Sequence, residues 1–249
     1  MSVVSFIGHV PYYDAPHLVA IASAPLVPIL FWLAFRSQKN DLWKNRVAYV
    51  LAGLLFLNEI AYRICLFSLA ETTTQFLNYG LPLHICPLSL FAGLIAITRR
   101  SQLAYEISFF WALTAPVNSI LTHDIIRPFP SFEFIGYFVS HCGSIWAALY
   151  ATLVLGMRPQ WISVWRVFVA ACVVGIISAV VDIVLVGANY AFMIHPPDAD
   201  NPFFAAPWPW YLLVIAVSSI GMFTAIYLPF HFMDRWKARK ISERSAEDA

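Results

Sequence analysis

The sequence is short of charge. Only 12% of its 249 residues are Asp, Glu, Lys or Arg, whereas 60% are hydrophobic. A typical soluble domain carries about 25% charged residues. It could not bury so large an apolar surface in a single core. The net charge of +1 offers no basic surface for nucleic acid, so we expect no nucleic-acid partner. These shortages exclude an ordinary soluble protein and indicate a membrane protein.

Cysteine and membrane-buried lysine are scarce as well. The four cysteines, Cys65, Cys86, Cys142 and Cys172, lie in apolar stretches without CxxC spacing, which disfavours a disulfide framework and a zinc site. No lysine lies within a long apolar run, which excludes a retinal Schiff base. The first 15 residues contain no Lys or Arg and no cleavage pattern, so we expect the first apolar segment to be retained. We predict no metal and no cofactor.

Seven apolar segments are long enough to cross a bilayer, which takes about 20 helical residues. They span residues 15–35, 46–70, 79–98, 103–121, 132–156, 163–187 and 209–231. Their continuous apolar runs favour helices over the alternating strands of a barrel. The sequence therefore predicts an all-α membrane protein, a bundle of seven transmembrane helices forming one integral membrane domain over residues 1–249.

The basic residues fall mainly on one side of these segments. The residues on that side are Arg36, Lys39, Lys44, Arg46, Arg99, Arg100, Arg158, Arg166, Arg235, Lys237, Arg239, Lys240 and Arg244. Arg127 alone lies on the other side, and Arg63 lies within the second segment. Because cytoplasmic loops retain Lys and Arg, this pattern predicts an external N-terminus and a cytoplasmic C-terminus.

Each polar side chain inside an apolar segment is expected to have a structural or functional role, because Asp or Arg at a membrane centre costs at least about 2.5 to 3.5 kcal/mol. The predicted orientation brings most of them to one layer near the external face; these are Arg63, His84, Cys86, Asn118, His141, Asp182 and Asn189. Glu106, near the cytoplasmic end of its segment, is the exception. Glu59 and Arg63 are four residues apart, so they either form a structural ion pair or line a polar cavity.

The stretch LPLHICPLSLF, residues 81–91, is the most informative one. Pro82 and Pro87 interrupt it, so the helix must kink or open, and the Leu83 carbonyl loses its usual donor. We expect Pro87 to disfavour α geometry at Cys86 and to leave the thiol accessible. A base for this thiol should come from another helix, and His141 lies at a suitable depth. The alternative is a kinked helix with an inert buried cysteine.

Four blocks carry a resemblance to a known family: LPLHIC at 81–86, FVSHCG at 138–143, GANYAFMIHPP at 187–197 and PWPWY at 207–211. They resemble the YwaF-like family of bacterial integral membrane proteins, over about residues 45–231. That family is distantly similar to eukaryotic multi-span lipid acyltransferases and to the androgen-induced and androgen-dependent fatty-ester hydrolases, which use a Cys or Thr nucleophile and an intramembrane His. The resemblance implies a bacterial inner membrane protein with Cys86 as nucleophile and His141 as its partner.

Two functions remain open at this stage. In the first, the chain is a lipid acyltransferase or ester hydrolase acting on membrane lipids, with Cys86 and His141 catalytic. The supporting residues would be His84, Arg63, Glu59, Asn118, Asp182 and Asn189. The loop at 189–211 would be either a lid over the site or a passive cap. In the second, the polar layer belongs to a small-molecule or ion transporter. A membrane protein without catalytic activity is a further alternative, and nothing in the sequence indicates a protein partner.

Overall fold

The computed structural model describes residues 13–123, 125–197 and 202–247, and within these ranges the chain is helical with no strand. The α-helices are α1 (Ala15–Phe35), α2 (Asp41–Leu69), α3 (Thr73–Tyr79), α4 (Ile85–Arg99), α5 (Gln102–Ala112), α6 (Ala115–Leu121), α7 (Phe132–Leu153), α8 (Trp161–Val184) and α9 (Trp210–Glu247). Two short 3-10 helices, η2 (Tyr190–Phe192) and η3 (Pro202–Phe204), lie between α8 and α9.

Four of the described helices are long and apolar enough to cross a membrane: α1, α2, α8 and α9 as far as Lys240. α4 is a shorter apolar helix. The prediction of a helical membrane protein is thereby confirmed in its general form. The number of spans and their direction across the bilayer stay predictions.

Two expected segments are interrupted. The segment at 79–98 becomes helical only from Ile85, because α3 ends at Tyr79 and residues 80–84 form a non-helical connection. The segment at 103–121 consists of α5 and α6, separated at Leu113 and Thr114. Pro116 in the first turn of α6 has no N–H to continue the hydrogen bonds of α5. The Thr114 hydroxyl donates to the carbonyls of Phe110 and Trp111, at 2.9 and 3.1 Å, and so stabilises the break.

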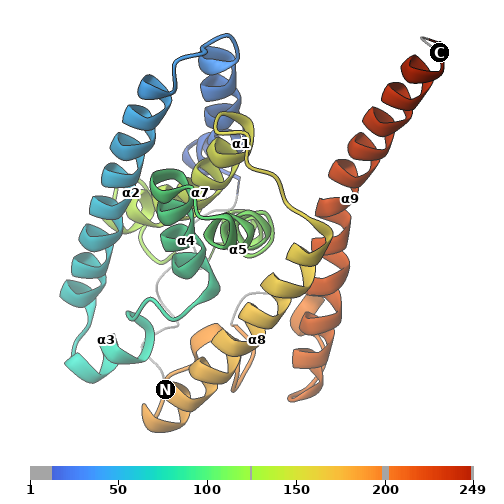
Figure 1. Cartoon of the computed structure of the whole chain (residues 1–249). Helices are drawn as coiled ribbons and strands as arrows, with labels where there is room; N and C mark the ends of the chain where they lie inside the picture. The colour runs from blue at the N-terminus through green and yellow to red at the C-terminus, as the bar shows by residue number, and fades with distance from the viewer. Residues whose placement is uncertain (1–12, 124, 198–201, 248–249) are drawn as a thin grey trace.

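α7 is the centre of the bundle and packs against α1, α2, α4, α5 and α6 (Figure 1). Small residues allow these helices to approach closely, as is usual between membrane helices. A Cβ added to Gly93 of α4 would lie 2.8 Å from the Ser108 hydroxyl and 2.9 Å from the Ala147 Cβ. The helix–helix contact therefore depends on the absence of a side chain at this position.

The turns of the bundle gather at two opposite ends (Figure 1). At one end, Arg100 bonds to Asn45 at 2.7 Å and to the Leu155 carbonyl at 3.3 Å, and Arg158 pairs with Asp234 of α9 at 3.0 Å. We call this the basic end. At the other end lie α3, the start of α4, the end of α8 and the loop that follows α8. The residues expected to carry chemistry lie mostly at this second end.

Candidate thiol and imidazole site

The break between α3 and α4 is held by groups from other elements. Pro87 cannot donate to the Leu83 carbonyl, and the Ser178 hydroxyl of α8 donates to it instead, at 3.2 Å. The Leu81 amide donates to the Tyr190 hydroxyl at 3.0 Å, and that hydroxyl donates to the Leu77 carbonyl at 2.7 Å. Because α4 begins only at Ile85, the Leu83 carbonyl lies before the helix, and the Ser178 hydroxyl is its donor.

The phenol of Tyr190 is suited to this role because it stays protonated. Burial raises the pKa of Tyr190 above its usual value of 10, and Asp182 acts in the same direction, whereas the Leu81 amide and Arg63 oppose them. The hydroxyl therefore remains a donor for the Leu77 carbonyl over the whole physiological pH range.

Cys86 lies in the first turn of α4 and is half-buried. The expectation that Pro87 would remove Cys86 from α geometry is wrong. Pro87 occupies the third helical position, where the N–H has no partner within the helix, so proline is accommodated without distortion. A sulfur at this position lies at the positive end of the α4 dipole, which stabilises negative charge. Cys86 therefore lies at the N-terminal end of α4 with an undistorted helical backbone.

A chain of contacts links Cys86 to His141. The Cys86 sulfur lies 3.5 Å from the Ser119 hydroxyl of α6. The Tyr137 hydroxyl of α7 donates to the Ser119 carbonyl at 3.0 Å. The Tyr137 ring packs on the ring of His141, with centroids 4.0 Å apart. We call these four residues the Cys86 cluster.

The tautomer of His141 follows from its hydrogen bond. Its Nδ1 lies 2.8 Å from the Tyr137 carbonyl, which can only accept, so Nδ1 carries the proton. In the neutral ring the lone pair is then on Nε2. An imidazole in this state can act as a base through Nε2, while the bond at Nδ1 fixes the direction of the ring.

Glu59 and Arg63 form the expected ion pair on α2. Glu59 is only 2% exposed, and Arg63 Nε donates to its Oε1 at 2.8 Å. Each partner also binds a second element. Arg63 Nη1 donates to the Gly80 carbonyl at 3.1 Å, and Ser140 donates to Glu59 Oε2 at 2.6 Å. The pair therefore connects the break before α4 to the residue that precedes His141.

His84 connects the Cys86 region to the loop after α8. Its Nδ1 accepts from the Ala191 amide at 3.2 Å, and its ring packs on Tyr190 and Phe192, with centroids 5.1 and 5.5 Å apart. Arg63 and His141 both lie close enough to act electrostatically on His84. The loop expected to be a lid or cap thus contacts the residue two positions before Cys86.

Asp182 and Asn189 shape this loop. Asp182 is 5% exposed, and its Oδ1 accepts from the Tyr190 amide at 2.8 Å. Asn189 bonds to the ring and backbone of His195 at 2.8 to 3.2 Å. Asn118 of α6 is half-buried beside Ser119, and its carbonyl accepts from the Thr122 amide at 2.9 Å. Asp182 and Asn189 are brought to the expected end, where each binds the loop backbone.

Glu106 lies apart, at the basic end, where it is fully buried and pairs with Arg166 of α8 at 3.5 Å.

Ser119 and Tyr137 were not among the site residues predicted from the sequence. In the sequence, only their closeness to predicted site residues could have pointed to them, since Ser119 follows Asn118 and Tyr137 precedes His141 by one helical turn. No group of three His, Cys, Asp or Glu residues within the described chain is arranged to hold a metal ion.

Comparison with known proteins yields one family. The family model described as the TMEM164 family matches residues 12–227. No curated protein and no solved structure matches the chain.

Proposed function

This chain belongs to the TMEM164 family of multi-span membrane proteins, and from this premise we propose that it is a lipid acyltransferase or ester hydrolase with Cys86 as nucleophile and His141 as base. The observation that carries the proposal is the Cys86 cluster, in which two residues from α6 and α7 link the thiol to the imidazole. The resemblance to YwaF-like proteins and to the lipid acyltransferases belongs to the same proposal.

Acyl transfer begins with a proton transfer. His141 Nε2 takes the thiol proton from Cys86, while the Tyr137 carbonyl holds the proton on Nδ1. The thiolate then attacks the carbonyl carbon of a lipid ester, and the carbonyl oxygen becomes an oxyanion. The amides of Ile85 and Cys86, in the first turn of α4, have no carbonyl within the helix to bond and can donate to this oxyanion.

The intermediate collapses by breaking the ester C–O bond. The leaving alcohol takes the proton from His141, and the acyl group remains on Cys86 as a thioester. In the second half, His141 takes a proton from an incoming alcohol or from water, which attacks the thioester carbonyl. Collapse of that intermediate returns the proton to the sulfur and releases a new ester or a fatty acid.

The remaining polar residues act as positioning residues in this proposal. The Glu59–Arg63 pair fixes α2 against Gly80 and Ser140, on either side of the reacting groups. His84 holds the loop after α8 close to the entrance of α4. In this arrangement an acyl chain lies among the apolar helices while its ester reaches the polar layer.

The proposed topology has seven spans, an external N-terminus and a cytoplasmic basic end, in a bacterial inner membrane. It is supported by the grouping of basic residues in the turns that meet at the basic end, since cytoplasmic loops retain Lys and Arg. The Cys86 cluster then opens toward the outer leaflet.

An activity-based lipid probe tests the assignment. Full-length protein in detergent should react with an acyl-phosphonate or fluorophosphonate lipid, and Cys86→Ala should abolish the labelling. Cys142→Ala is the matched control, because Cys142 is a buried thiol that donates to the Ala20 carbonyl at 3.4 Å. Equal labelling of the Cys86→Ala protein would remove Cys86 as the acceptor. Solute flux in proteoliposomes that survives Cys86→Ser would favour a transporter instead.

A further inference from the structure

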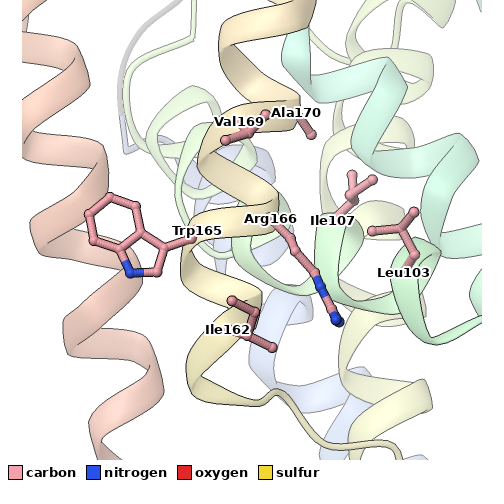
Figure 2. Close-up of a pocket in the computed structure, with 7 residues that line it drawn as sticks. All are labelled: Leu103, Ile107, Ile162, Trp165, Arg166, Val169 and Ala170. Atoms are coloured by element: carbon pink, nitrogen blue, oxygen red, sulfur yellow. The ribbon is translucent and has the colours of Figure 1, made fainter.

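We propose that the groove between α5 and α8 binds an anionic phospholipid from the membrane leaflet at the basic end. The groove has a volume of about 610 Å³. Its lining residues are Leu103 and Ile107 of α5 and Ile162, Trp165, Arg166, Val169 and Ala170 of α8. Figure 2 shows Arg166 extending from α8 into the space between the two helices.

The only charged residue of this lining is Arg166, whose side chain is 50% exposed. Its Nη1 lies 3.5 Å from Glu106 Oε2, a distance and geometry that make an ion pair but no hydrogen bond. Glu106 is itself held in place by Gln102, which donates to its Oε1 at 3.0 Å. Arg166 makes no hydrogen bond to any described residue. A guanidinium has five N–H donors in a planar fork, so Glu106 can orient it while other donors bind a phosphate.

The surroundings favour an anionic ligand. Arg158 is paired with Asp234 at 3.0 Å and Arg100 is bonded to Asn45 at 2.7 Å, and neither of these two arginines lines the groove. The turns at this end nevertheless carry an excess of positive charge that raises the local potential. Arg166 is the one charged residue among those that line the groove, and a phosphate with net negative headgroup charge matches it.

The rest of the groove matches an acyl chain. Leu103 and Ile107 are one helical turn apart on α5, and Arg166 and Ala170 are one turn apart on α8, so both walls run parallel to their helix axes. A chain lying between them has its headgroup at Arg166. Trp165 is 46% exposed at the same level, as expected of an aromatic residue at the membrane interface.

This lipid site is separate from the Cys86 cluster. Cys86 lies in the first turn of α4, whereas Leu103 of the groove follows the C-terminal end of the same helix by four residues. The proposal therefore does not depend on catalysis by Cys86. Its test measures lipid binding and needs no enzymatic activity.

The experiment is a lipid titration of the purified full-length protein in detergent, followed by native mass spectrometry. Phosphatidylglycerol and phosphatidylcholine with the same acyl chains are the two probes. We expect phosphatidylglycerol to bind about tenfold more tightly, because the phosphatidylcholine headgroup has no net charge. Arg166→Gln should weaken phosphatidylglycerol binding about tenfold and remove most of the preference for phosphatidylglycerol over phosphatidylcholine.

Two further variants separate charge from shape. Val169→Trp fills the groove without changing the charge and should also weaken phosphatidylglycerol binding. It also covers the case in which Arg166→Gln fails to fold because Glu106 loses its counter-ion. Arg235→Gln removes an exposed charge from the same end and should bind lipid as the wild type does. Equal binding of the two lipids, unchanged binding by Val169→Trp, or equal losses from Arg166→Gln and Arg235→Gln would overturn the proposal.

Discussion

Replacing Glu59 by Gln should destabilise the protein strongly. Glu59 is 2% exposed and receives hydrogen bonds from Arg63 and from Ser140, at 2.8 and 2.6 Å. A glutamine keeps the shape of the side chain but removes its charge, and it presents an amide N–H₂ to one of these donors. Arg63, which is 21% exposed, then remains in the bundle without its counter-ion.

Removing one partner of a buried ion pair costs about 3 to 5 kcal/mol, and the partial exposure of Arg63 favours a value of about 3 kcal/mol. At about 2 to 4 °C per kcal/mol for a chain of this size, Tm should fall by about 6 to 12 °C. The assay is thermal unfolding of the detergent-solubilised protein, followed by tryptophan emission. Glu71→Gln, at an exposed acidic residue near the same end, is the control and should leave Tm within about 2 °C of the wild type, since surface substitutions usually change stability by less than about 0.5 kcal/mol.

The double variant Glu59→Met with Arg63→Met distinguishes a lost counter-ion from lost packing. Replacing both charges by apolar side chains of similar volume is often neutral. The double variant should therefore recover most of the stability lost in Glu59→Gln. A Glu59→Gln protein that unfolds at the wild-type temperature, or a double variant less stable than the single one, would refute the reasoning.

Three smaller substitutions test the other contacts. Tyr137→Phe removes the bond to the Ser119 carbonyl and keeps the aromatic ring, so kcat on a fluorogenic lipid ester should fall about tenfold with KM unchanged; an unchanged kcat would mean that this bond has no part in the reaction. Ser178→Ala leaves the Leu83 carbonyl without its donor, and the free energy of unfolding should fall by about 1 to 3 kcal/mol in chemical denaturation. No loss would show that water replaces the hydroxyl. Cys142→Ala should retain full activity on the same ester, and loss of turnover would point to the wrong cysteine.

The sequence predicts much of the fold because composition and length decide it. A chain with so little charge and such long apolar runs has to form membrane helices. The i,i+4 spacing of Glu59 and Arg63 was sufficient to predict their pairing, because both partners lie on one face of one helix. Pro87 was expected to free the Leu83 carbonyl and to distort Cys86, but in the first turn of α4 it accounts for neither. That outcome depends on where the helix begins, and the start at Ile85 is set by contacts from α8 and the following loop.

The contacts between helices could not be predicted in the same way. Ser119 is 33 residues from Cys86, and nothing in its local sequence marks it as a neighbour of the thiol. The division of α5 from α6 brings Ser119 to that position, and it depends on the hydroxyl of Thr114 as well as on Pro116. Asn189 was placed at the correct end, but its bonds to His195 form only because the loop folds back on itself.

The most direct test of the Cys86 assignment is peptide mass spectrometry of the protein after brief incubation with a phospholipid. The account predicts an acyl group on Cys86, attached by a thioester that hydroxylamine cleaves, with less acylation in His141→Ala and none in Cys86→Ala. An acyl group on a residue other than Cys86, or acylation of the Cys86→Ala protein at the wild-type level, would contradict it.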